Sequence, residues 1–228
     1  MYSAFAPVYD QLMDDFPYDE LLEIFSSLAP LRGRILEMGC GSGRFTRKVF
    51  PRASFYWAMD VSEEMLSLAA RRLGNPAGLQ LLLDEGEAFP EKLDTVLAAV
   101  DVVNYMDEES LSLFFARSHQ ALVPGGALIF DVSSERKLRE KLSDHVFVFE
   151  RDEFTLIWQN RFSREDKGIY FDLTIFLKEG ALYRKETEMH FQRAWQPAEI
   201  QSALRAAGFQ EIRQLEALDR EIFAAYKR

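Results

Sequence analysis

The sequence predicts an α/β fold with a Rossmann-like, doubly wound and mostly parallel sheet of about seven strands. Three observations support this prediction. Short apolar runs alternate with amphipathic segments through the first half of the chain, as they do in β-α-β units. A glycine-rich loop, residues 39–43, follows the first of these runs. From about His145 the apolar period becomes two, which is typical of antiparallel strands.

Five apolar runs are expected to form the parallel part of the sheet, with helices between them. The runs are residues 34–38, 54–60, 79–83, 93–100 and 127–132. The expected helices are residues 44–50, 62–73 and 108–122, the last of them ended by Pro124-Gly125-Gly126. Late in the chain the sequence predicts a helix over 197–207, ended by Gly208, and strands over 209–218 and 221–228. A leading segment, residues 17–28, carries one apolar stripe and is expected to be a helix that acts as a lid or cap.

Residues 145–195 are expected to form a β-rich antiparallel insertion. Glycine-containing turns at 165–168 and 178–180 separate three runs of period two. The helical and strand-like segments that follow the insertion resume the pattern of the first half. We therefore expect one principal domain, residues 1–144 and 196–228, interrupted late by this insertion.

Composition and charge exclude several classes of protein. With 48% hydrophobic and 28% charged residues, the chain has the balance of an ordinary globular protein. No window reaches the roughly 20 apolar residues of a membrane span, and the start lacks a signal peptide, so we expect no membrane partner and a cytoplasmic location. The single cysteine, Cys40, and three histidines offer no metal-site spacing, so no metal is expected. The formal net charge of −10 repels phosphate, so no DNA partner is expected, while RNA stays open.

The most informative stretch is RILEMGCGSGRFT, residues 34–46. An apolar strand leads into Gly39, Gly41 and Gly43 and then into a helix, whose amino end offers free N–H groups. Asp60 ends the next apolar run, where a carboxylate can accept hydrogen bonds from both hydroxyls of a ribose. Together these features indicate a nucleotide-type site. The alternative is a bare turn, with Asp60 capping the following helix.

Two classes of cofactor use this layout, and the spacing of the glycines separates them. The dinucleotide fingerprint G-x-G-x-x-G needs a glycine where this chain has Arg44. The segment Glu37-Met38-Gly39-Cys40-Gly41-Ser42-Gly43 resembles instead the E/D-x-G-x-G-x-G motif of the class I S-adenosylmethionine-dependent methyltransferases. The resemblance extends over nearly the whole chain and implies S-adenosylmethionine as the cofactor. A nicotinamide oxidoreductase stays open as an alternative, as does a protein that binds the cofactor without turnover.

The resemblance implies a set of cofactor-binding residues. They are Tyr9, Glu37, Gly39, Gly41, Gly43, Asp60, Val61, Met65, Asp84, Glu85 and Asp101. The glycines would border the methionine part of the cofactor, Asp60 would hold the ribose, and Val61 and Met65 would lie near the adenine. Glu37 would orient the loop or contact the cofactor's amino group. Asp84 or Glu85 would read the adenine amino group, with the spacing to Pro90 favouring Glu85. Tyr9 would cover the sulfonium as a lid.

The end of the fourth apolar run is where the resemblance puts the reactive methyl group. Asp101, Asn104 and Tyr105 are therefore the residues expected nearest the chemistry, with hydrogen bonding at a strand end as the alternative. Of these, Asn104 and Tyr105 are candidate catalytic residues. Methyl transfer from a sulfonium is an in-line displacement, so positioning can supply much of the acceleration and a strong base is not obligatory.

The insertion is expected to select the methyl acceptor, because additions beyond the strand ends determine what reaches the methyl group. Period two in residues 186–195 puts His190 on one face and Arg193 and Trp195 on the other. His190 is a candidate proton acceptor and Arg193 a candidate clamp for a carboxylate or phosphate. Tyr105 and Trp195 complete the candidate substrate contacts. For His190 and Arg193 the alternative is a solvated strand face with a salt bridge. A small-molecule acceptor is expected, and RNA is the alternative acceptor. The oligomeric state stays open between a monomer and a dimer.

Overall fold

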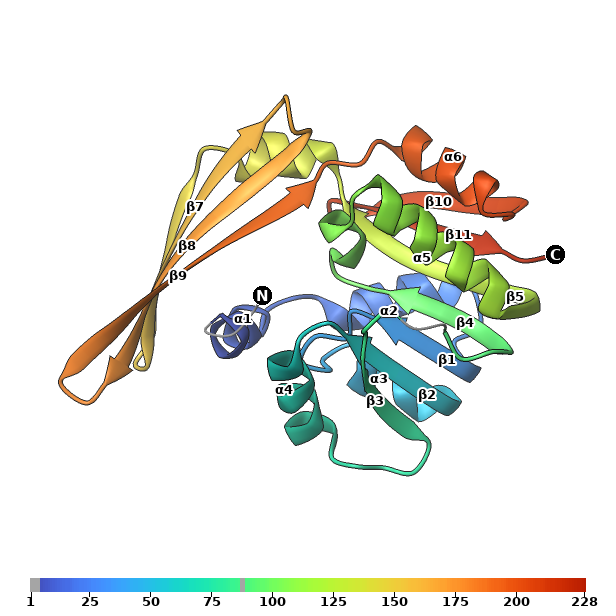
Figure 1. Cartoon of the computed structure of the whole chain (residues 1–228), viewed down its shortest axis with the longest axis horizontal. Helices are drawn as coiled ribbons and strands as arrows, with labels where there is room; N and C mark the ends of the chain where they lie inside the picture. The colour runs from blue at the N-terminus through green and yellow to red at the C-terminus, as the bar shows by residue number, and fades with distance from the viewer. Residues whose placement is uncertain (1–4, 87–88) are drawn as a thin grey trace.

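The computed structural model describes residues 5–86 and 89–228, which fold into two sheets (Figure 1). Residues 1–4, where the predicted principal domain begins, and residues 87–88, in the acidic segment after the predicted third strand, lie outside the described residues. The larger sheet has seven strands in the order β10-β11-β5-β4-β1-β2-β3. Their bounds are β1 (Gly33–Met38), β2 (Ala53–Asp60), β3 (Leu79–Leu83), β4 (Leu93–Ala98), β5 (Leu122–Ser133), β10 (Glu211–Ala217) and β11 (Arg220–Tyr226).

Helices cover both faces of the larger sheet. They are α2 (Tyr18–Leu28), α3 (Thr46–Val49), α4 (Glu63–Leu73), α5 (Glu108–Ala121) and α6 (Pro197–Ala206), with the short 3-10 turns η1 (Phe50–Arg52) and η2 (Val102–Tyr105). The helix α1 (Ala6–Leu12) and the π-helix η3 (Lys137–Leu142) pack instead against the second sheet. One hydrophobic core contains Phe115 of α5 and Ile200 of α6. The core on the other face contains Phe25 of α2 and Val49 of α3. Neighbours among β3, β2, β1, β4 and β5 are parallel, and β11 is antiparallel to β5 and β10, so the predicted doubly wound, mostly parallel sheet is confirmed.

Some element boundaries differ from the prediction. The helix expected over residues 44–50 is only Thr46–Val49, followed by the 3-10 turn η1. β5 already begins at Leu122, so Pro124-Gly125-Gly126 lies in an irregular part of the strand instead of a turn before it. The cause is a shift in the register between β4 and β5, which lets the strand absorb these residues as a bulge.

The leading helix does not act as a lid. α2 nearly matches the expected range, but Leu21 and Phe25 are fully buried in the core beneath the sheet. The element nearer the second sheet is α1, a separate short helix that precedes α2. Phe5 and Val8, at the start of α1, are buried against that second sheet.

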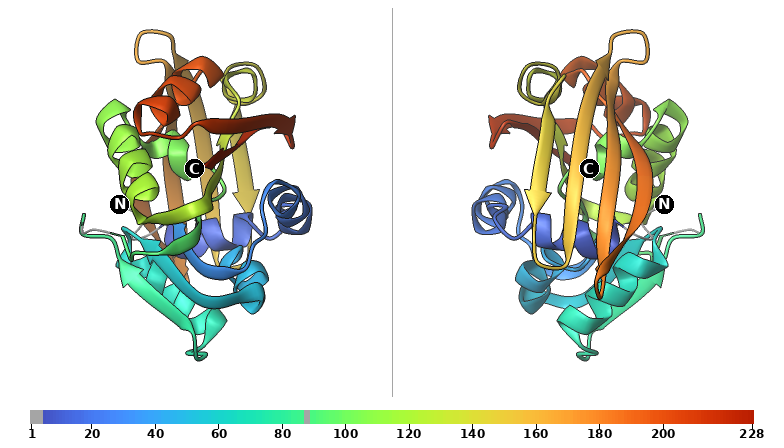
Figure 2. Two further views of the ribbon diagram at one scale, coloured as in Figure 1. Left: turned by 90° about the vertical axis from the view of Figure 1, so that its right-hand side faces the viewer. Right: turned by 90° about the vertical axis from the view of Figure 1, so that its left-hand side faces the viewer.

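The second sheet is formed by the segment expected as an insertion. Its strands are β6 (Val146–Glu150), β7 (Phe154–Ser163), β8 (Gly168–Glu179) and β9 (Leu182–Arg193), antiparallel in the order β6-β7-β8-β9. Leu156, Phe171 and Ile175 form its buried face. The sheet is long and twisted, and it projects beyond the larger sheet with α1 between the two (Figures 1 and 2). Within residues 5–86 and 89–228, no helix is long and apolar enough to cross a membrane.

A buried carboxyl group in the larger sheet ties three elements together. Glu37 of β1 is only 1% exposed. The hydroxyl of Thr46, at the start of α3, donates to Oε2 of Glu37 over 2.5 Å, and that of Tyr56 on β2 donates to the same oxygen over 2.8 Å. Burial raises the pKa of Glu37 to about 7, against the lowering effect of both hydrogen bonds. This carboxyl group therefore fixes the start of α3, just after the glycine loop, to β1 and β2.

The raised pKa of Glu37 predicts a specific pH dependence of stability. The unfolded chain, with an ordinary value of 4.5, loses this proton first. The group's favourable contribution to the free energy of unfolding is therefore full below pH 4.5 and is lost as the pH rises to about 7, by up to about 1.4 kcal/mol per pH unit. Glu37→Gln keeps an acceptor oxygen for both hydroxyls and cannot titrate. Its stability relative to the wild type should therefore rise between pH 5 and pH 8.

Urea unfolding of both proteins at several pH values measures this difference. Glu23→Gln, an exposed position on α2, is the control and should follow the wild type at every pH. Parallel pH curves for Glu37→Gln and the wild type would contradict the prediction.

Candidate functional site

A cavity of about 440 Å³ lies at the carboxyl ends of β1, β2, β3 and β4. Its volume falls in the range of roughly 300–1,000 Å³ that is usual for small-molecule sites. The strand order changes direction between β1 and β4, and ligands of open α/β sheets bind at this switch point. The sequence-predicted residues that line it are Tyr9, Gly39, Gly41, Asp60, Val61, Met65, Asp84 and Tyr105. Most of the expected cofactor-binding set thus comes together in one cavity.

The glycines of the loop serve different purposes. Gly39 and Gly41 line the cavity, with φ of +67° and +54°. A Cβ on Gly39 would lie 2.5 Å from a methyl carbon of Val102, whereas one on Gly41 would meet nothing within 4 Å. Gly41 therefore gives a ligand open access to the backbone. Gly43 lies outside the cavity lining and packs against Leu73 of α4, where a Cβ would approach to 2.8 Å.

Asp60 ends β2 and connects the loop to the next helix. Its Oδ2 accepts the N–H of Gly41 at 2.7 Å and its Oδ1 accepts that of Ser62 at 3.0 Å. Burial raises the pKa of Asp60, while these backbone hydrogen bonds oppose the rise. A carboxylate has about four lone-pair sites, so Asp60 can accept further hydrogen bonds from a ligand in the cavity. Acceptors of this kind are what the hydroxyls of a ribose need.

At the end of β3, Asp84 and not Glu85 reaches the cavity. Asp84 lines it, whereas Glu85 is exposed and outside the lining. Nη2 of Arg117 on α5 lies 3.7 Å from Oδ1 of Asp84, and the guanidinium stacks 4.1 Å from the ring centre of Phe89. The preference for Glu85 from its spacing to Pro90 is therefore not supported by the geometry, because the chain turns away immediately after Asp84.

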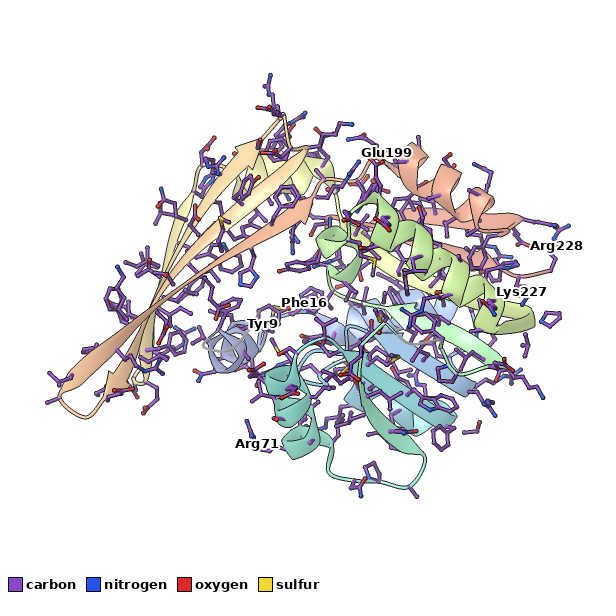
Figure 3. The ribbon with its side chains drawn as sticks, in the orientation of Figure 1. Tyr9, Phe16, Arg71, Glu199, Lys227 and Arg228 are labelled. Atoms are coloured by element: carbon purple, nitrogen blue, oxygen red, sulfur yellow. The ribbon has the colours of Figure 1, made fainter. Side chains whose placement is uncertain are left out.

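Tyr9 stands at the cavity on a helix that ion pairs hold in place (Figure 3). The neighbouring carboxylate of Asp10 accepts hydrogen bonds from the Ser42 hydroxyl, from Nε of Arg44 at 2.8 Å and from Nη2 of Arg72 at 2.7 Å. Burial works against ionisation, but these hydrogen bonds hold the pKa of Asp10 below its ordinary value. We call this set the Asp10 latch. It fixes α1 to the glycine loop and to α4.

Asp101 and Asn104 do not line the cavity. The carboxylate of Asp101 accepts two hydrogen bonds from Arg220, at 2.6 and 3.0 Å, and one from the Ser133 hydroxyl at 2.5 Å. Oδ1 of Asn104 accepts the N–H of Ser133 at 2.8 Å, and its Nδ2 donates to the carbonyl of Arg193 at 2.9 Å. Both side chains therefore brace η2 against β5, β9 and β11. Among the three residues expected nearest the chemistry, only Tyr105 faces the cavity.

Arg193 and Trp195 also lie outside the cavity. Trp195 is 2% exposed and donates its indole N–H to the carbonyl of Val103 at 3.0 Å. The guanidinium of Arg193 stacks 4.0 Å from the ring centre of Trp195 and pairs with Glu108 at 2.7 Å. The alternation expected through 186–195 breaks because β9 ends at Arg193, and the chain then turns Trp195 into the core.

His190 is buried on the second sheet, close to the cavity but not part of its lining. Its Nε2 lies 3.3 Å from Oε2 of Glu188, and its ring centre is 6.3 Å from that of Tyr105 and 5.4 Å from that of Phe5. Burial lowers the pKa of His190, although Glu188 opposes this. The imidazole is therefore neutral near pH 7 and able to accept a proton.

Several cavity residues were missed by sequence reasoning. They are Met38, Val100, Val102, Met106, Ser110, Leu113, Phe114 and Arg117. The last four lie on one stripe of α5 with the spacing i, i+3, i+4, i+7. That stripe is visible in the sequence, but a stripe that faces a ligand looks the same as one that faces a core. Among residues 5–86 and 89–228, no group of three His, Cys, Asp or Glu side chains could hold a metal ion.

The residues of the cavity fit S-adenosylmethionine. An open glycine backbone and the free acceptor sites of Asp60 suit its amino acid and ribose parts, and apolar residues of α4 and α5 flank Asp84 where a base would lie. Arg117 is the cationic side chain among the described lining residues, so the lining favours a ligand without a large negative charge.

Comparison with known proteins agrees with this fit. Residues 35–126 match the family model described as a methyltransferase domain. YqeM of Bacillus subtilis (strain 168), whose name assigns it to the methyltransferases, is 30% identical over 214 residues, which cover 92% of this chain and 87% of YqeM.

Two solved structures share the fold. An S-adenosylmethionine-dependent methyltransferase from Clostridium acetobutylicum ATCC 824 has a TM-score of 0.78 and 26% identity, with 99% of this chain and 98% of that one covered. CalS10, an amino pentose methyltransferase from Micromonospora echinaspora with S-adenosylmethionine bound, has a TM-score of 0.76 and 18% identity, with 100% and 98% covered. The chain therefore belongs to the S-adenosylmethionine-dependent methyltransferases and uses S-adenosylmethionine as its cofactor.

Proposed function

We propose that this methyltransferase acts on a small-molecule acceptor that reaches the cofactor cavity from the side of the second sheet. The observation that carries the proposal is the contact between Tyr105 and His190. Tyr105 lines the cavity, and its ring packs edge-on, at 85°, against the buried His190 of β9. The segment 145–195 would then select the acceptor, while residues 1–144 and 196–228 bind the cofactor.

Small molecules are favoured over RNA on two grounds. The formal net charge of −10 repels a phosphate backbone. CalS10 shares the fold and is named for an amino pentose substrate, which is a small polar molecule. A cytoplasmic location, without DNA as a partner, accompanies this proposal.

The cofactor would lie with its adenosine part at Asp60 and Asp84 and its methionine part at Gly39 and Gly41. When bound, S-adenosylmethionine would supply a methyl group on a positively charged sulfur: the acceptor's lone pair would form a bond to the methyl carbon as the carbon–sulfur bond breaks in line, with S-adenosylhomocysteine as the leaving group. The protein's task is then to orient the two reactants and exclude water. Tyr9, held by the Asp10 latch, would cover the reacting end of the cavity.

On the acceptor side, His190 would take the proton that an N–H or O–H acceptor loses. Its imidazole is neutral because burial lowers its pKa, and the Glu188 carboxylate 3.3 Å away would stabilise the imidazolium once it forms. Tyr105 would orient the acceptor between His190 and the cavity. Glu37, Asp101 and Asn104 would act only by fixing the backbone around the cavity through their hydrogen bonds.

The first test concerns Asp60. Asp60→Asn replaces one carboxylate oxygen with an amide NH₂, which removes the charge and at least one acceptor site. Loss of charge-assisted hydrogen bonds should weaken S-adenosylmethionine binding about 10- to 100-fold. Calorimetric titration measures the affinity, with Asp172→Asn, an exposed position on β8, as the matched control. An unchanged affinity in Asp60→Asn would remove Asp60 from the site.

The second test concerns the Asp10 latch. Asp10→Asn keeps the shape of the side chain but weakens its contacts with Arg44 and Arg72, so α1 should lift more easily and S-adenosylmethionine should dissociate about three to ten times faster. Added salt should accelerate dissociation from the wild type more than from the variant. Stopped-flow displacement measures the rate. Asp14→Asn, whose side chain is 63% exposed and pairs with the same Arg44, is the control. Equal rates in all three proteins would contradict the lid role.

The third test identifies the acceptor class. Formation of S-adenosylhomocysteine is measured with amino sugars, small amines, hydroxy acids and short RNAs as acceptors. With an accepted small molecule, His190→Gln should lower kcat about 100-fold and leave the Kd for S-adenosylmethionine within twofold. His145→Gln, an exposed histidine beside the same sheet, should behave as the wild type. Turnover of RNA with no small molecule accepted would overturn the proposed substrate class.

A further inference from the structure

The cavity wall next to the glycine loop has an unusual backbone. β4 ends at Ala98, two residues before the predicted end, and Val100 and Asp101 then have φ of +66° and +68°. Residues other than glycine rarely adopt this left-handed conformation, and a β-branched valine is especially disfavoured there. Such a conformation persists only where the surrounding structure imposes it. Val100 and Val102, on either side of Asp101, both line the cavity.

Buried side chains from two neighbouring strands impose the turn. Oδ1 of Asp131 on β5 accepts the N–H of Val100 at 2.7 Å. Arg220, the first residue of β11, donates from Nη1 and Nη2 to the two oxygens of Asp101, at 2.6 and 3.0 Å. Nη1 of Arg220 also contacts Oδ2 of Asp131. We call these three side chains the Arg220 network.

The Arg220 network is enclosed by protein. The side chains of Arg220 and Asp131 are 3% and 0% exposed, and that of Asp101 is 19% exposed. Lys137 adds a further positive charge through Ser133, whose hydroxyl donates to Asp101 and accepts from Nζ of Lys137 at 2.9 Å. Burying charges in this way is costly, and well-packed apolar side chains often give a more stable core. Global stability alone therefore does not account for the arrangement.

The strand order indicates which part of the ligand this wall meets. Along the sheet the order is β4-β1-β2-β3, with Asp60 and Asp84 at the ends of β2 and β3. If the adenosine part lies at these two residues, the end of β4, on the other side of β1, faces the methionine part. Val102 supports this position, because its side chain fills the space that a Cβ on Gly39 would occupy.

We propose that Arg220 is a positioning residue for the methionine end of S-adenosylmethionine. Together with Asp131 and Asp101 it holds residues 100–101 in the left-handed turn that places Val102 in the cavity wall facing Gly39. Arg220 lies outside the cavity lining and acts through the backbone of this turn, which follows β4. The proposal rests on the proposed orientation of the cofactor, with its adenosine part at Asp60 and Asp84.

Two mild substitutions test the Arg220 network without leaving a large hole. Arg220→Lys keeps the charge but loses the planar fork that binds both oxygens of Asp101. Asp101→Asn keeps the shape and leaves Arg220 paired with Asp131. Arg213→Lys, at an exposed position on β10 of the same hairpin, is the control.

The probes are S-adenosylmethionine and 5′-methylthioadenosine, which has the same adenosine and sulfur but no amino acid tail and no charge. In both network variants the Kd for S-adenosylmethionine should rise at least tenfold, while that for 5′-methylthioadenosine stays within twofold. A purely structural role would move both constants together, and urea unfolding of each variant records any global loss of stability. Unchanged constants, or equal changes for both probes, would overturn the proposal.

Failure of this inference can be told apart from failure of the proposed cofactor site. Asp60→Asn should weaken the binding of both probes, because both contain the ribose. Suppose that Asp60→Asn raises the Kd of both probes, but that the Arg220-network variants bind both probes like the wild type. The proposed cofactor site is then supported and the role of Arg220 is rejected. If Asp60→Asn changes neither Kd, the proposed orientation of the cofactor is wrong, and the inference about Arg220 is wrong with it.

Discussion

Backbone N–H groups at the buried ends of parallel strands need acceptors, and in this protein carboxylates supply them. Asp60 accepts the N–H groups of Gly41 and Ser62, and Asp131 accepts that of Val100. An N–H left without a partner in such a place would cost as much as a lost hydrogen bond. The sharp turns that make room for the cofactor therefore depend on acids placed one strand away. Of these acids Asp60 also lines the cavity, where a carboxylate suits a cofactor with a positively charged sulfur.

The two sides of the cavity are held by interactions of different character. Arg220 and Asp131 of the Arg220 network, behind the cavity, are almost fully buried, so solvent and salt screen this pair little. The Asp10 latch, in front, is about one fifth exposed at Arg44 and Arg72. It can open at a modest free-energy cost, whereas opening the Arg220 network would leave buried charges without partners. This difference in burial supports the proposed roles of a fixed wall at Arg220 and a movable lid at Tyr9.

The pairing of the glycine loop with Asp60, which the sequence predicted, is local in the chain. The glycine loop and Asp60 are separated by about 20 residues, and hydrogen bonds within that short span define their geometry. Asp101 and Asn104 were expected at the chemistry because they follow β4, but their partners are remote: Arg220 is 119 residues from Asp101, and Arg193 is 89 residues from Asn104. A strand-end acid that faces a ligand and one that faces a buried arginine look alike in one sequence. Packing against distant elements also explains why the apolar stripe of α2 serves the core and not a lid.

The side of the site proposed to hold the acceptor is assembled from parts with little in common in the sequence. Tyr9 comes from α1, Tyr105 from η2, and His190 from the second sheet. Tyr9 and Tyr105 line the cavity, and His190 packs against the ring of Tyr105 from the second sheet. If the second sheet selects the acceptor, as proposed, the fold can keep one cofactor while the acceptor changes, because His190 lies on a segment separate from the glycine loop and reaches the cavity through its contact with Tyr105.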